Sequence, residues 1–225
     1  MFERETIRHS RPMRNAVPAG SALTRLFRTL GLTIRVLPFV SIANPAAESR
    51  AEPIVWKAGA YSISDELGGF RITGVSGTGT SADPIVIEEE LNSASPVTLT
   101  FRTIRPIQPF ADAGYYANGI LHMRIETLNN SGQPWVEFEF ELQEILNQPS
   151  VFGDGLSFDQ RNKNPTEIVS SAFAEFSRDF EPYDRLLFEN GKVDPLATVT
   201  FAFLITDYTP RWTFYLVQDP RIPSS

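Results

Sequence analysis

The sequence contains no cysteine, only two histidines and no long run of apolar residues. Without cysteine, disulfide frameworks, cysteine-ligated zinc, iron–sulfur clusters and thiol catalysis are all excluded. His122 is the only histidine after residue 50, so zinc and non-haem iron sites lack their usual imidazole ligands. The sequence therefore predicts no metal site of these kinds and no cofactor.

Positive charge is scarce in most of the chain. Residues 1–50 hold eight Arg and three Glu, whereas the remaining 175 residues hold 12 basic and 24 acidic side chains. Nucleic-acid binding needs a cluster of basic side chains, which this acidic part does not supply. With 42% apolar residues in the whole chain, there is enough material for one ordinary domain with a core. We predict a single domain over residues 52–225 that does not bind nucleic acid.

Residues 1–47 form a basic N-terminal segment. Residues 6–47 contain six arginines and no acidic residue, and an apolar run at 30–43 is followed by small residues. This order is typical of a secretory signal peptide, with an organellar presequence and a plain basic arm as alternatives. The run contains Arg35 and is shorter than the roughly 20 residues that cross a bilayer as a helix. We expect a cleaved or disordered export segment, a periplasmic or extracellular protein, and no permanent membrane span.

From residue 52 onwards, apolar residues mostly alternate with polar ones, and Gly, Pro, Asn and Asp interrupt the alternation. This pattern is typical of short β-strands joined by turns. It predicts an all-β fold, an antiparallel β-sandwich of immunoglobulin-like or jelly-roll-like type, with at most one short helix. Residues 166–180 fit either that helix or an irregular strand. The candidate strands cover residues 54–62, 69–75, 84–91, 97–105, 119–128, 136–142, 186–189, 198–206 and 212–218.

The alternation is strongest in residues 120–142. Leu121, Met123 and Ile125 share one face of the first strand, and Phe138, Phe140 and Leu142 share one face of the second. We predict an antiparallel hairpin with Ile125 opposite Phe138 and with His122 beside Glu141 on the solvated face. The glutamates of the second strand on that face, Glu137, Glu139 and Glu141, would protect this strand against edge pairing if it were exposed.

Asn129-Asn-Ser-Gly-Gln-Pro-Trp135, followed by an alternating strand, resembles the N-N-[ST]-G-x-x-W hairpin of small exported bacterial β-sandwich proteins. Segments within residues 182–218 resemble the same group, although Leu196 stands where a glycine is usual in the turn. The group has no assigned activity, so the resemblance implies export and a sandwich fold. Asn129-Asn-Ser131 also matches the N-glycosylation acceptor pattern.

No catalytic constellation emerges from the residues. A serine hydrolase would have to use His122 as its base, and nothing in the sequence places a serine and an acid around it. The glutamates at 88–90 are expected on solvated faces, without the enclosed acid of raised pKa that glycoside cleavage needs. For Asp154 and Asp159, an ordinary turn and a weak calcium site both fit the sequence.

Aromatic residues in the expected loops are the remaining site candidates. Tyr115 and Tyr116 lie between Gly114 and Asn118-Gly119, a composition typical of a loop, and Trp135 ends a turn. Loop aromatics offer planar surfaces for sugars or peptides, whereas the alternative for Trp135 is that it and Trp212 plug the ends of the core.

We therefore predict a non-catalytic binding or interaction module at the cell surface or outside the cell. Its ligand-binding residues would be Tyr115, Tyr116 and Trp135, and its partner a protein or a glycan of unknown identity. The alternatives are a structural component of an extracellular matrix or envelope and a weakly marked hydrolase.

Overall fold

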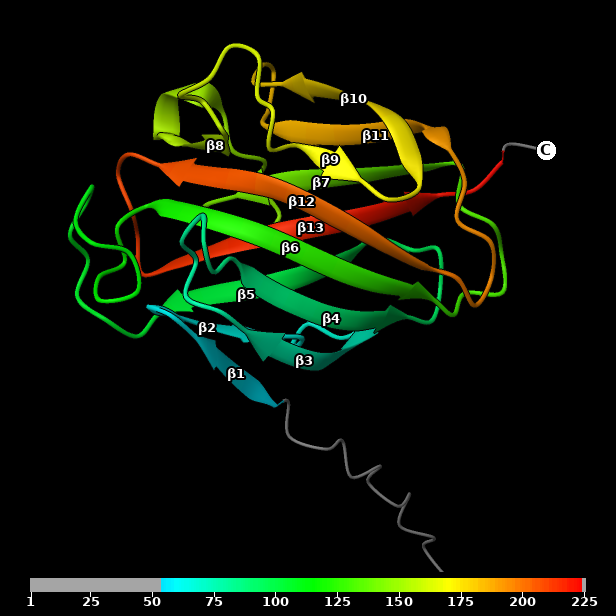
Figure 1. The fold of residues 1–225 in the computed structure, drawn as a ribbon, viewed down its shortest axis with the longest axis horizontal. Helices are drawn as coiled ribbons and strands as arrows, with labels where there is room; N and C mark the ends of the chain where they lie inside the picture. Colours follow the sequence, from blue (N-terminus) through cyan, green and yellow to red (C-terminus); the bar gives the residue numbers. More distant parts are fainter. Residues whose placement is uncertain (1–53, 224–225) are drawn as a thin grey trace, which may run out of the picture. The chain divides into compact units, whose positions relative to one another are not determined.

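A computed structural model describes residues 54–223, which form two packed β-sheets (Figure 1). The seven-stranded sheet has the order β1 (Val55–Ala58), β2 (Tyr61–Ser64), β5 (Val97–Thr103), β13 (Thr213–Arg221), β7 (Glu137–Gln143), β11 (Arg185–Gly191) and β10 (Phe173–Asp179). The six-stranded sheet has the order β3 (Phe70–Ser76), β4 (Ile85–Leu91), β6 (Ile120–Asn129), β12 (Thr198–Asp207) and β8 (Leu156–Phe158), with β9 (Val169–Ser170) also paired to β12.

The predicted all-β sandwich is confirmed. The only helical element in residues 54–223 is a short 3₁₀ turn at Phe152–Asp154, and none of the described helical structure could cross a bilayer. The predicted export segment, residues 1–47, and the first residues of the predicted domain lie outside the described residues.

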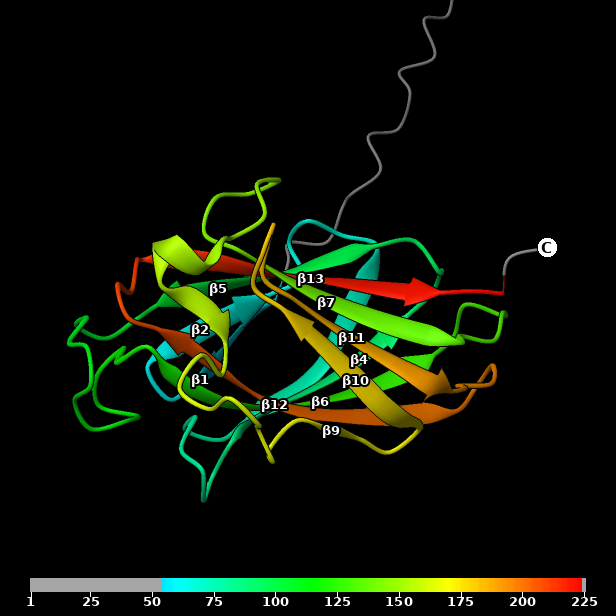
Figure 2. The same ribbon diagram turned by 90° about the horizontal axis from the view of Figure 1, so that it is seen from above.

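Alternation in the sequence becomes alternation of burial along each strand. β6 and β7 bury the apolar faces expected of them, and the charged residues of both strands lie on the opposite faces. Seen from above, strands of the seven-stranded sheet lie over β6 and β12 of the other sheet (Figure 2). Phenylalanines fill the space between the sheets: the ring centroids of Phe138 and Phe201 lie 4.6 Å apart, and those of Phe140 and Phe203 lie 4.9 Å apart. The core is therefore predominantly aromatic where β7 faces β12.

The predicted hairpin between β6 and β7 is wrong. β6 pairs with β12 and, in parallel, with β4, whereas β7 pairs with β13 and β11 in the other sheet. The two apolar faces meet across the sandwich instead of lying side by side, because burial requires only that both faces point into the core. The β4–β6 pair also makes the sandwich not wholly antiparallel.

The glutamates of β7 do not protect an edge, because β7 lies between two other strands. Glu139 accepts a hydrogen bond of 2.8 Å from Arg221 of β13, and Glu137 lies 3.4 Å from the same guanidinium. Arg185 of β11 lies 3.9 Å from Glu139 on the other side. The acidic ladder is thus matched by arginines of the neighbouring strands.

Residues 166–180 form an irregular strand region, so the alternative of a helix is wrong. β9 and β10 lie in different sheets, and β10 is the edge strand of its sheet. The predicted strand 54–62 is divided into β1 and β2 by a turn at Gly59, which has φ +52°. A side chain there would clash with the carbonyl of Thr78. Glycine is therefore required at this turn.

The Asn-Asn-Ser-Gly-Gln-Pro-Trp segment is a turn that leads from β6 to β7. The buried Asn129 side chain donates hydrogen bonds to the carbonyl oxygens of Gln133 (2.8 Å) and Val193 (3.0 Å). Its own oxygen accepts from Ser131, and Trp135 Nε1 donates to Ser131 Oγ at 3.1 Å. Because Asn129 uses its amide group in this turn, it is not presented as a glycan acceptor.

Trp135 has no exposed surface (0%), and its ring lies 5.6 Å from that of Phe138. A ligand-binding role does not fit this position. The alternative interpretation, that Trp135 plugs one end of the core, describes it correctly.

Candidate functional site

Three loops gather at one end of the sandwich: residues 104–119 after β5, 144–155 after β7 and 208–212 after β12 (left in Figure 1). The strand register explains this, because β13 begins beside the ends of β5 and β7, and β6 begins beside the end of β12. We call these three loops the loop end.

The loops of the loop end are bonded to one another. The amide of Asp207 donates to the carbonyl of Gly119 at 2.6 Å, and the amide of Tyr208 donates to that of Gly155 at 3.0 Å. The rings of Phe110 and Tyr208 lie 5.5 Å apart. Contacts of this kind hold the three loops together as one surface.

Exposed apolar side chains are concentrated in the loop end. Of the sixteen large apolar side chains that are exposed in residues 54–223, nine belong to these three loops. They are Ile104, Phe110, Tyr115, Ile145, Leu146, Val151, Phe152, Tyr208 and Trp212. Concentrations of exposed apolar surface are typical of interaction sites.

Of the predicted site residues, the structure places two in the loop end. Tyr115 is 76% exposed, and Tyr116 beside it is partly buried. Trp135 lies at the opposite end, in the turn between β6 and β7. The sequence prediction therefore identified one of the three loops.

For Trp212, the alternative interpretation as a plug at one end of the core is wrong. It is 67% exposed and does not plug the core. It has the parity of the buried Phe214 and Leu216, but it precedes the first residue of β13 and so lies beyond the sheet. The adjacent Thr-Pro turn was the signal that could have placed it in a loop.

Carboxylates accompany the apolar residues of the loop end. Glu144 Oε2 forms an ion pair with Arg211 Nε at 2.8 Å, whereas the buried Glu144 Oε1 has no hydrogen-bond partner. Burial raises the pKa of Glu144 above its ordinary value, and the charge of Asp154 raises it further. Burial also raises the pKa of Asp207 to about 6, with Glu144 and Asp154 adding to the effect. Three carboxylates thus share the neighbourhood of one guanidinium.

A pocket of about 250 Å³ opens among these charges. Its lining combines charged and polar groups with aliphatic walls: Glu144, Ile145, Gln148, Pro149, Val151, Asp154 and Arg211. The pocket can therefore receive a group that is polar at its tip and apolar along its stem.

Asp154 and Asp159 do not form a calcium site together. Asp154 accepts hydrogen bonds from the amides of Val151 and Leu156, and Asp159 accepts from the side chain of Asn162. Within residues 54–223, no three carboxylate or imidazole groups converge closely enough to hold a metal ion. Both aspartates act in turns.

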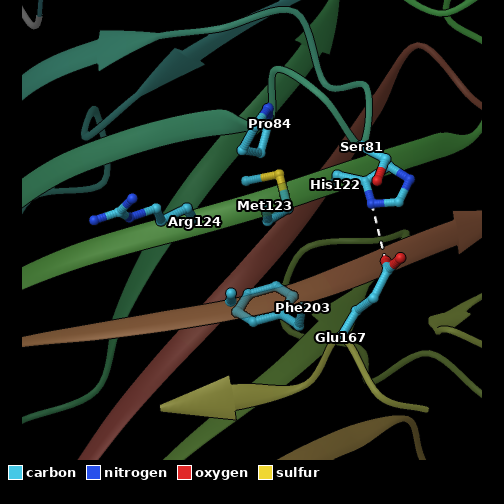
Figure 3. A pocket seen from close by; sticks show the side chains of 8 residues that line it. Ser81, Pro84, His122, Met123, Arg124, Glu167 and Phe203 are labelled. Atoms are coloured by element: carbon cyan, nitrogen blue, oxygen red, sulfur yellow. Dashed lines mark ion pairs between the residues drawn. The ribbon is translucent and has the colours of Figure 1, made fainter. Parts of the chain in front are cut away.

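A second pocket, of about 270 Å³, surrounds His122 on the outer face of the six-stranded sheet (Figure 3). His122 Nδ1 lies 3.0 Å from Glu167 Oε2, so the predicted neighbour Glu141 is wrong because β7 belongs to the other sheet. Ser81 lines the same pocket, but among the described residues the side-chain partner of His122 is Glu167 and not Ser81. The pocket contains an acid–imidazole pair without an engaged nucleophile.

The expectation that no acid is enclosed is also wrong. Glu89 is 2% exposed and points between the sheets, where it accepts hydrogen bonds from Thr127 (2.9 Å) and Gln218 (3.0 Å). Burial raises its pKa to about 7. The sequence indicates this burial, because Glu89 lies on the same face of the strand as Ile85 and Ile87. The inward carboxyl of Glu89 links β6 of one sheet to β13 of the other.

No protein-family model matches this sequence, and no curated protein matches it significantly. Its function is therefore inferred from its own geometry.

Proposed function

We propose that this protein is a binding module that acts outside the cytoplasm, and that the loop end is its ligand-binding surface. The observation that carries the proposal is the concentration of nine exposed apolar side chains in three loops that are bonded together. A rigid sandwich can hold such loops in a fixed arrangement, as binding proteins commonly do. Contact with a ligand would remove this apolar surface from water and so stabilise the complex.

The binding test compares the loop end with another exposed apolar site. Tyr115→Ala and Trp212→Ala are expected to abolish retention on peptide and polysaccharide arrays without lowering the melting temperature. Leu196→Ala is the matched control, because Leu196 is equally exposed but lies outside the loop end. Retention that survives both loop variants, or that is absent from both arrays, would contradict the proposal.

Export is supported by the order of the N-terminal residues, in which an arginine-rich stretch precedes an apolar run and small residues. We expect mature protein in the periplasm or culture medium to begin after this segment. The N-terminal residue of that mature protein is the measurement. Protein that keeps the whole segment and stays in the cytosol would show that the export part of the proposal is wrong.

A second candidate function, hydrolysis, rests on the His122–Glu167 contact. A carboxylate at Nδ1 can orient an imidazole whose other nitrogen acts as a base, and Ser81 lines the same pocket. A broad panel of esters and glycosides tests it: turnover should be lost in His122→Ala and lowered in Glu167→Gln. The absence of turnover by the unmodified protein would remove this candidate.

A further inference from the structure

We infer that the loop end recognises a cationic side chain, Lys or Arg, of a protein partner, and that this side chain enters the pocket at Glu144. The inference rests on the proposed function of the loop end as a binding surface and specifies the chemistry of its ligand.

Charge complementarity is the first argument. Glu144 and Asp154 line the pocket, the charge of Asp154 raises the pKa of Glu144, and both charges raise the pKa of Asp207. Arg211 is the cation that opposes these effects on Glu144 and Asp207. Negative charge therefore remains in excess beside the pocket. The acidic character of residues 51–225 as a whole would also attract a cationic partner from a distance.

The second argument is an unsatisfied acceptor. The Glu144 side chain is only 7% exposed and lines the pocket, yet Oε1 receives no hydrogen bond. A buried carboxylate oxygen without a donor is unfavourable, and an incoming ammonium or guanidinium would supply the missing donor. Arg211 contacts only Oε2, and its largely exposed side chain can turn away to admit the ligand.

The shape of the site favours a side chain over a sugar. Ile145 and Val151 provide aliphatic walls that fit the stem of Lys or Arg, while the carboxylates lie where the charged tip would be. The exposed Leu146 and Phe152 of the same loop can cover apolar residues on either side of the cation. A neutral glycan would leave the excess negative charge uncompensated.

The test uses labelled peptides that share an apolar sequence and differ in one central residue: Lys, Arg, norleucine or Glu. Fluorescence anisotropy with the full domain should show binding about tenfold tighter for Lys and Arg than for norleucine, as one charge-assisted contact implies. Glu144→Gln should remove about that tenfold preference. Arg211→Ala should instead tighten binding of the Lys peptide, because it removes the competing cation.

Glu88→Gln is the control, since Glu88 is an exposed carboxylate of β4 outside the loop end. Equal binding of the Lys and norleucine peptides, or a preference that Glu144→Gln and Arg211→Ala leave unchanged, would overturn the inference. If Trp212→Ala still abolishes binding of norleucine peptides or glycans in that case, the proposed function stands and only the cationic ligand is wrong. If no loop variant changes any binding, both are wrong.

Discussion

Glu89 occupies a position in β4 where an apolar residue would ordinarily be expected. Its carboxylate is buried between the sheets, and burial raises its pKa from 4.5 to about 7. The folded protein therefore binds this proton more tightly than the unfolded chain does. Stability that Glu89 provides is present below pH 4.5 and is lost as the pH rises through about 7.

Glu89→Gln is expected to stabilise the protein at pH 8 and to have little effect at pH 5. The difference approaches about 3 kcal/mol, because the neutral amide avoids the cost of a buried charge. Urea unfolding at the two pH values measures it. Burial raises the pKa of Asp184 to about 7 as well, so the variant should keep part of the decline with pH. Equal effects of the substitution at both pH values would contradict the prediction.

Leu196 adopts the left-handed backbone conformation, with φ +67°, and its side chain is exposed. A leucine in this region carries steric strain that glycine avoids. Leu196→Gly is expected to raise the free energy of unfolding by about 0.5–1 kcal/mol. Leu196→Ala retains the strain and should give no gain. Chemical denaturation distinguishes them, and a loss of stability in the glycine variant would refute the assignment of strain.

At the scale of elements, sequence periodicity predicted which face of each strand is buried but not which strands pair. The apolar residues of β6 and β7 satisfy the same alternation whether the strands are neighbours in one sheet or face each other across two. Short strands and strands at the edge of a sheet were harder still to predict from the sequence. β8 has three residues and includes the buried Ser157, and β10 buries little of its surface at the sheet edge. Neither has the alternation that marks a longer strand.

The turn between β6 and β7 provides a test at this scale. Asn129→Ala should lower the free energy of unfolding by about 2–3 kcal/mol, because the buried Asn129 side chain loses its hydrogen bonds to the carbonyls of Gln133 and Val193 and the one it accepts from Ser131. Asn130→Ala is the matched control, since Asn130 makes its side-chain contacts at the exposed surface. Urea denaturation measures the free energy of unfolding of both variants. Equal losses in the two variants would show that the role assigned to Asn129 is wrong.

The site was predicted less completely than the strands. Composition placed Tyr115 in a loop, and the structure agrees, but the sequence does not show which loops share an end of a sandwich. That depends on strand order, which brings residues 144–155 and 208–212 beside residues 104–119. Trp135 and Trp212 both adjoin turns, yet one is held inward by Ser131 and the other extends past its sheet. Long-range register decides such differences.

At the scale of the whole molecule, the described core is formed by residues between Ala58 and Leu216. We expect a protein that begins at residue 49 to show a β-type circular dichroism spectrum and to unfold cooperatively. Its melting temperature should match that of the full-length chain within about 2 °C, since the shared core provides the stability. A mainly helical spectrum, or a large drop in melting temperature, would contradict this.

The position of β13 has a consequence for the order in which the protein acquires its structure. This strand lies between β5 and β7, so the middle of the seven-stranded sheet stays open until residue 221 has been synthesised. Val97 of β5, for example, pairs with Gln218, which is synthesised 121 residues later. Folding on the ribosome therefore stops short of completion, and the growing chain keeps its apolar strands accessible to chaperones. The export that we propose would benefit from this delay, because an incompletely folded chain can still be threaded through a narrow channel.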